Sequence, residues 1–180
     1  MACIPTLRTP PHEHAFSADG SLLLNTYLEV SEAAGRAFFS RPITGSITML
    51  NLLRFREVAD YSATPALVPA VASAIGTAPP SATPLSGEAA YLLYMEQTLP
   101  HLAASGGELL FYGRGGPWLI GPPGEYWDAA MLVRQSSLQS FLAFASNPAY
   151  LEVMAHRTAA LADSRLLPLL PDSVVAALMP

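Results

Sequence analysis

Residues 137–165 carry the pattern that most restricts how this chain can fold. Apolar residues recur there at intervals of three and four along two successive segments, which is the spacing of one helical face. Between the segments stand Asn147 and Pro148. A proline pushes the residue before it out of the helical conformation and suits the first position of a new helix. The pattern therefore predicts two helices joined by a corner, over residues 137–162.

The second of these helices carries two polar residues of interest. Arg157 falls on the apolar stripe, while His156 falls on the neighbouring face, one turn after Glu152. A buried guanidinium is costly unless a carboxylate or an anionic ligand meets it. We therefore expect Arg157 either to pair with Asp128, the most suitable internal carboxylate, or to hold a ligand. The sequence leaves two interpretations of His156: a solvated ion pair with Glu152, or a role in a functional site.

Four other segments have the composition and alternation of strands, and one more has the period of a helix. The strands are expected at residues 46–56, 108–114, 126–134 and 165–170. The helix is expected over 87–104, with Ser86 as its N-cap. Residues 46–56 are apolar on both strand faces, which is typical of a strand covered on both sides. Asn51 and Arg54 are polar groups in that strand and need partners.

The remaining segments are expected to surround one domain at residues 44–170. Residues 1–20 are proline-rich with few large apolar side chains and are predicted to form a flexible arm. An extension at 21–43 is predicted to hold one helix, at 31–40. A proline-rich insert at 57–86 is interpreted as a lid, a dimer arm or a disordered segment, and a tail follows at 171–180. His12 and His14 lie in the arm without a third fixed ligand, which is more typical of surface residues than of a metal site.

Composition limits the classes of function. The chain has 180 residues, 51% hydrophobic and 13% charged, which suits one well-filled core. A formal net charge of −5 leaves no basic field for a phosphate backbone, so nucleic acid is not expected as a partner. The single cysteine, Cys3, cannot form an internal disulfide, which fits a reducing cytoplasm. No stretch approaches 18 unbroken apolar residues, and the N-terminus lacks an export pattern, so neither a membrane span nor export is expected.

The order strand, helix, strand, strand, helix, strand over residues 46–170 predicts an α+β fold. It is the split βαβ pattern of a ferredoxin-like domain, with an antiparallel sheet and both helices on one face. The chain offers no third layer for the other face, although the strands stay apolar on both sides. A second copy is the natural cover, and the sequence therefore predicts a homodimer.

Several short motifs carry a resemblance that spans roughly residues 44–168. They are MLNLLRFR, SGEAAY, GGELLFYGR, WDAAMLVR, SNPAY and HRTAALADSR, in this order. With them the chain resembles the bacterial domain of unknown function 1330 family, within the dimeric α/β-barrel superfamily. The resemblance implies a ferredoxin-like fold and a barrel-like dimer, whose interior hosts ligands or small oxygenase and isomerase sites in more distant relatives. It implies no chemistry for this family. The chain departs from the pattern in its N-terminal arm, in the insert near 62–83, and at Gln135, where tyrosine or phenylalanine followed by proline is usual.

The sequence contains no metal-binding, dinucleotide or Walker-type motif, and we expect neither metal nor organic cofactor. What remains is a set of candidate residues in an otherwise apolar protein. The candidate catalytic residues are His156, Tyr112 and Asp128, and the candidate substrate-binding residues are Asn51, Arg54, Arg157 and Trp127.

Two hypotheses of different classes fit these candidates. One is a cofactor-independent enzyme acting on a small apolar carbonyl compound or phenolic acid. In it Arg54 or Arg157 binds the carboxylate or enolate, His156 is the general base, and Tyr112 or Asn51 places an oxygen. The other is a non-catalytic ligand-binding protein or structural dimer.

Overall fold

The computed structural model describes residues 26–67 and 84–171. The expected arm at 1–20, with His12 and His14, lies outside these residues, as do the middle of the insert and all of the tail except residue 171.

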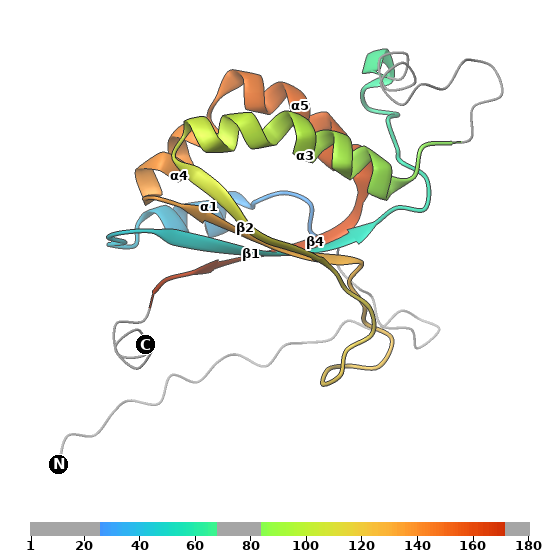
Figure 1. Cartoon of the computed structure of the whole chain (residues 1–180), viewed down its shortest axis with the longest axis horizontal. Helices are drawn as coiled ribbons and strands as arrows, with labels where there is room; N and C mark the ends of the chain where they lie inside the picture. Colours follow the sequence, from blue (N-terminus) through green and yellow to red (C-terminus); the bar gives the residue numbers. More distant parts are fainter. Residues whose placement is uncertain (1–25, 68–83, 172–180) are drawn as a thin grey trace.

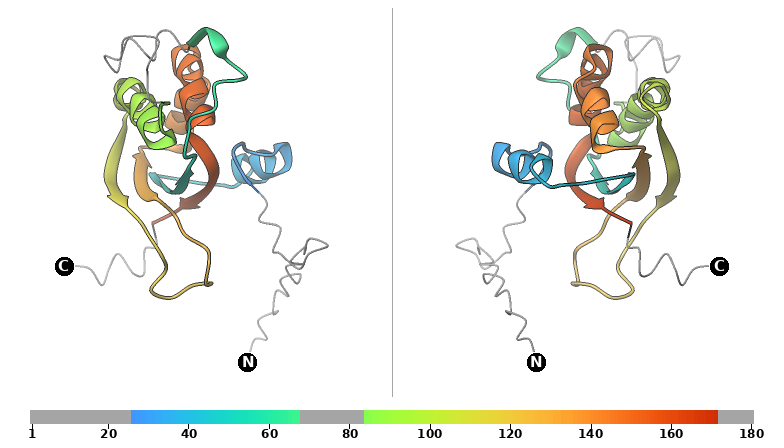
Figure 2. Two further views of the ribbon diagram at one scale, coloured as in Figure 1. Left: turned by 90° about the vertical axis from the view of Figure 1, so that its right-hand side faces the viewer. Right: turned by 90° about the vertical axis from the view of Figure 1, so that its left-hand side faces the viewer.

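Four strands form one antiparallel sheet in the order β2-β3-β1-β4 (Figure 1). They are β1 (Ile47–Phe55), β2 (Gly107–Arg114), β3 (Ala129–Gln135) and β4 (Leu161–Leu169). Three helices, α3 (Gly87–Ala104), α4 (Leu138–Ala145) and α5 (Pro148–Ala160), lie on one face of the sheet (Figures 1 and 2). This arrangement confirms the α+β, ferredoxin-like fold that the sequence predicts.

The helix ends form where the sequence places their caps. Asn147 accepts hydrogen bonds from the backbone N–H groups of Ala149 and Tyr150, and Pro148 opens α5, so the corner between α4 and α5 is confirmed. Ser86 caps α3 in the same way, by accepting from the N–H of Ala89 at 3.2 Å. Gly106 follows α3 with a φ of 79°, a left-handed conformation that favours glycine.

The last strand begins earlier than the sequence predicts. We expected it at residues 165–170, but β4 starts at Leu161, directly after α5. Leu161 is fully buried. A buried leucine fits the apolar stripe of a helix and the covered face of a strand equally well, so periodicity could not locate this boundary.

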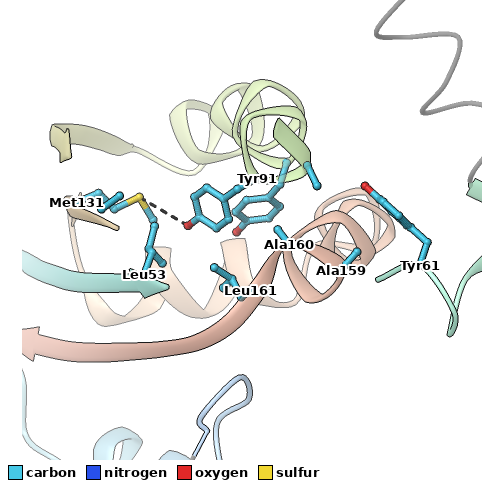
Figure 3. Close-up of a cluster of buried hydrophobic side chains, with 10 residues drawn as sticks. Leu53, Tyr61, Tyr91, Met131, Ala159, Ala160 and Leu161 are labelled. Atoms are coloured by element: carbon cyan, nitrogen blue, oxygen red, sulfur yellow. Dashed lines mark hydrogen bonds between the residues drawn. The ribbon is translucent and has the colours of Figure 1, made fainter. Parts of the chain in front are cut away.

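The core lies between the helices and the sheet. Tyr91 of α3 packs over Leu53 of β1 and Leu161 of β4, and all three are completely buried (Figure 3). The Tyr91 hydroxyl points toward Met131 of β3, with 3.9 Å from its oxygen to the sulfur. Gly87 permits the close approach of α3, α5 and the end of β1, because a Cβ there would lie 2.4 Å from the carbonyl oxygen of Ala160. The fully buried alanines Ala90 and Ala160 extend this close packing.

The extension contains the helix expected at 31–40, as α1 (Glu32–Phe39). Ser31 caps it, but none of its residues is buried. Its Phe38 and Phe39 rings contact Phe141 of α4, with centroids 6.3 and 6.2 Å away. The insert contributes a short 3-10 helix, η1 (Pro65–Leu67).

The second face of the sheet, which we call the open face, points away from the helices. Directly paired residues of antiparallel strands share a face, so the register assigns its members. They include Leu50, Leu52, Arg54, Phe111, Ala130, Leu132, Asp163, Arg165 and Leu167. Among the described residues no helix packs on this face. The loop between β2 and β3, residues 115–128, projects on this side of the sheet (Figures 1 and 2).

Candidate functional site

His156 lies on α5 and is 7% exposed, so the solvated pair with Glu152, one of the two interpretations of this residue, is wrong. Its Nδ1 lies 2.8 Å from the hydroxyl oxygen of Tyr61, and the two rings meet edge to face. Burial lowers the pKa of His156 below its ordinary value and raises the pKa of Tyr61. Tyr61 belongs to the beginning of the insert. The hydrogen bond therefore fastens that segment to α5.

Arg157 has partners, but not the one we expected. Its Nη1 donates to the carbonyl oxygen of Leu28 at 2.7 Å, and its Nη2 to the hydroxyl oxygen of Ser164 at 3.2 Å. The Asp128 carboxylate instead accepts the backbone N–H of Phe55 at 2.7 Å. The predicted Arg157–Asp128 pair is thus wrong, because Asp128 serves the end of β1 while Arg157 holds the extension against β4.

Tyr112 and Asn51 lie on the face that the helices cover. Tyr112 is half-buried on β2 and packs against the core, and burial, followed by the nearby charge of Glu88, raises its pKa. Asn51 lies in the middle of β1, and its amide nitrogen donates to the backbone oxygen of Met49 at 3.2 Å. Within the described residues, no hydrogen bond or ring contact joins either of them to His156, whose partner is Tyr61.

Arg54 and Trp127 do come together, in what we call the arginine–aromatic cluster. Its members are Arg54, Asp163, Arg165, Tyr27, Tyr126 and Trp127. The cluster lies at one end of the open face, because Arg54 pairs directly with Asp163, and Leu52 with Arg165, across β1 and β4. Trp127 was expected inside a strand beside Ala129. It instead precedes β3, since strand pairing ends where the Asp128 carboxylate accepts the N–H of Phe55.

Asp163 is the centre of this cluster and is only 1% exposed. One carboxylate oxygen accepts from Arg165 Nη1 at 2.6 Å and from the backbone N–H groups of Tyr27 and Ser164 at 2.7 and 2.9 Å. The other accepts from Arg54 Nη2 at 3.2 Å. Two guanidinium groups thus share one buried carboxylate, which neutralises only one of their charges.

Aromatic rings fix the second guanidinium. The guanidinium carbon of Arg165 lies 4.5 Å from the ring centre of Tyr27 and 5.0 Å from that of Trp127. Arg54 lies 6.0 Å from the ring of Tyr126. The indole N–H of Trp127 donates to Glu125 at 3.0 Å, so one more carboxylate stands beside the cluster. The Arg165 side chain stays 38% exposed, compared with 15% for Arg54.

Sequence reasoning missed Asp163, Arg165, Tyr27 and Tyr126 as site residues. The one signal available was the polar run Asp163-Ser164-Arg165 at the start of an otherwise apolar segment. Its meaning depends on the pairing of β4 with β1, which juxtaposes residues 109 positions apart.

An open cleft of about 500 Å³ adjoins the cluster through Tyr126. Asp128 lines it, together with residues of mixed charge: Arg56, Glu57, Glu88 and Arg114. Arg114 and Glu88 form an ion pair at 2.5 Å. The Arg56 Nε is buried and has no hydrogen-bond partner in the described part of the chain. The mixed charges of this cleft favour no particular ligand.

Within residues 26–67 and 84–171, no group of three or more His, Cys, Asp or Glu side chains could hold a metal ion, and no helix is both long and apolar enough to cross a bilayer.

Comparison with protein-family models and with curated proteins found no match. Among solved structures, the chain is similar to a protein of unknown function from Rhodopseudomonas palustris, at 28% identity and a TM-score of 0.68. The match covers 83% of this chain and 99% of that one. The methylated form of the same protein gives 28% identity and a TM-score of 0.67, over 83% and 98% of the two chains. A dimeric ferredoxin-like protein of unknown function from Thermobifida fusca gives 19% identity and a TM-score of 0.38, over 71% and 92%. The structural neighbours are thus proteins of unknown function, and they name no reaction.

Proposed function

We propose that this chain works as a homodimer, formed through the open faces of two sheets, which binds a small organic molecule between them. The observation that carries the proposal is the composition of the open face, which is apolar through its middle and has the arginine–aromatic cluster at one end and the Arg134–Glu108 ion pair at the other. Such a dimer agrees with the barrel-like assembly implied by the resemblance to the domain of unknown function 1330 family, and we propose membership of that family on the same motifs.

Exposed apolar side chains support the dimer. Leu167 and Phe111 on the open face are 53% and 54% exposed, and Leu119 and Ile120 in the adjoining loop are 100% and 90% exposed. Contiguous apolar surface of this kind is rare on monomers and marks an interaction site. A closed two-fold dimer buries the same patch on both copies, and a standard interface needs about 800 Å² from each.

The arginine–aromatic cluster supports ligand binding. It provides charged donors beside aromatic rings at the end of the same apolar face, which is the usual composition of a small-molecule site: largely apolar walls with a few placed polar groups. A second copy over this face would exclude bulk water from the site.

The positions of the candidate catalytic residues favour binding over catalysis. A general base must come within about 3 Å of the proton that it removes, directly or through one water. His156 is buried on α5 against Tyr61, Tyr112 lies under the helices, and the Asp128 carboxylate accepts a hydrogen bond at the end of β1. The enzyme hypothesis needs them in one pocket, so the non-catalytic ligand-binding dimer is the better proposal.

Native mass spectrometry of the protein purified from its own host tests this proposal. We expect a dimer that carries a small molecule, released when the dimer is dissociated. A dimer without any retained mass would favour a structural role, and a monomer without ligand would contradict the proposal as a whole.

A further inference from the structure

Within residues 26–67 and 84–171, the guanidinium groups of the arginine–aromatic cluster have more donors than they have recipients. Each guanidinium carries five N–H donors and no acceptor. Among the described residues, Arg165 donates only through Nη1, to Asp163 and to the backbone oxygen of Ser164. Within the same part of the chain, Arg54 donates through Nη2 alone. Asp163 already accepts four hydrogen bonds, about the capacity of a carboxylate, so it cannot satisfy the remaining donors. Those donors are left for water or for a ligand.

The guanidinium of Arg165 is already fixed in position in the absence of a ligand. Its guanidinium is held by two hydrogen bonds from one nitrogen and by two aromatic rings within 5.0 Å, while its side chain remains 38% exposed. A guanidinium fixed in this way loses little further freedom when it binds, and its planar fork matches the two oxygens of a carboxylate.

We propose that the arginine–aromatic cluster binds the carboxylate of a small organic acid, with the apolar body of the acid lying along the leucines of the open face; this rests on the proposed ligand-binding function. The cluster has one positive charge in excess over Asp163, and Glu125 stands nearby, so a singly charged acid fits better than a phosphate or a polyanion. Leu52 pairs with Arg165, and Leu50 pairs with Leu167, so leucine side chains continue from the cluster along the same face.

A matched pair of ligands tests the charge requirement. Phenylacetate and phenylacetamide have the same aromatic body but only the first carries a carboxylate, and their dissociation constants can be measured by calorimetric titration of the full chain. A hydrogen bond between two charged groups is stronger than one to a neutral amide, so we expect the acid to bind about tenfold or more tightly than the amide. Equal affinities, or no binding of either probe at millimolar concentration, would overturn the inference.

Substitutions at Arg165 and at a control position test which arginine gives the preference for the acid. Arg165→Gln should abolish the preference for the acid, and Arg165→Lys should reduce it, because lysine keeps the charge but not the planar fork. Arg134→Gln is the control, since Arg134 shares the open face but lies outside the cluster, in a surface ion pair with Glu108. Glu125→Gln should strengthen acid binding by removing a nearby like charge.

The outcomes separate this inference from the proposed function. Two results would overturn the inference. One is a loss of the preference for the acid in Arg134→Gln as large as that in the Arg165 variants, and the other is an Arg165→Lys protein that keeps the full preference. A wild-type dimer that retains a neutral molecule and does not prefer the acid would also overturn it, yet leave the proposed function standing.

Discussion

The two faces of the sheet are built from the same strands but are completed in different ways. On the helix-covered face, Leu53 and Tyr91 are fully buried by elements of the chain itself. On the open face, Leu167 is still 53% exposed, and the buried carboxylate of Asp163 lies at one end between two arginines. The first face thus forms the core of the fold. For the second face we propose a role in binding, to a second copy and to a small molecule.

Removing a side chain from the helix-covered face should have the largest effect. Tyr91→Ala would leave a cavity where a fully buried ring packs against Leu53 and Met131, and we expect a loss of about 3–5 kcal/mol in the free energy of unfolding. Chemical denaturation at two protein concentrations measures it, and the loss should be the same at both. A loss below about 1 kcal/mol would contradict the assignment of the core.

Removing the buried carboxylate of the open face should be nearly as costly. Asp163→Ala leaves Arg54 and Arg165 without their shared partner and leaves the backbone N–H of Tyr27 without an acceptor. We expect a loss of about 3 kcal/mol, near the lower end for a broken buried pair, because both guanidinium groups can still reach water. Thermal or chemical unfolding measures it. A variant as stable as the wild type would show that the cluster is not the structural centre of this end of the sheet.

Arg157→Met should lower the free energy of unfolding less than Tyr91→Ala or Asp163→Ala does. It removes the hydrogen bonds to Leu28 and Ser164 but keeps an apolar side chain of similar length, and we expect a loss of about 1–2 kcal/mol. Hydrogen exchange should show faster exchange in residues 26–28, which this arginine holds against β4. Unchanged exchange there would contradict the role assigned to Arg157.

His156 should give the smallest effect, visible as a pH dependence. Burial lowers its pKa below the ordinary 6.5, so the unfolded chain binds more protons at His156 than the folded chain does. Its contribution to stability is therefore present above about pH 6.5 and is lost as the pH falls through the folded-state pKa. Thermal unfolding between about pH 7 and pH 5 should show a steeper loss for the wild type than for His156→Gln. Parallel pH profiles would contradict the buried, neutral histidine.

The elements of the fold could be predicted because their signals are local. Helical spacing, the Asn147-Pro148 corner and alternating strands each depend on a few neighbouring residues. The start of β4 could not be predicted in this way, because a buried leucine such as Leu161 fits a helix and a strand equally well.

The candidate site depends on contacts that are distant in sequence. The sequence indicates that Arg54 needs a partner, but Asp163 becomes that partner only through the register of β1 and β4. The partner of Arg157 is the backbone oxygen of Leu28, a group that every residue carries and that no side-chain pattern can indicate. The partner of His156 is Tyr61, in the proline-rich insert, where no pattern in the sequence singles out one residue.

Sedimentation velocity at micromolar concentration tests the central claim, that a second copy covers the open face. Leu167 on this face and Leu151 on the outer side of α5 are each 53% exposed. The two aspartate variants therefore introduce the same charge at equally exposed positions. We predict that the wild type and Leu151→Asp sediment as dimers, while Leu167→Asp dissociates to a folded monomer. A monomeric wild type, or a dimer that Leu151→Asp disrupts and Leu167→Asp leaves intact, would contradict the account.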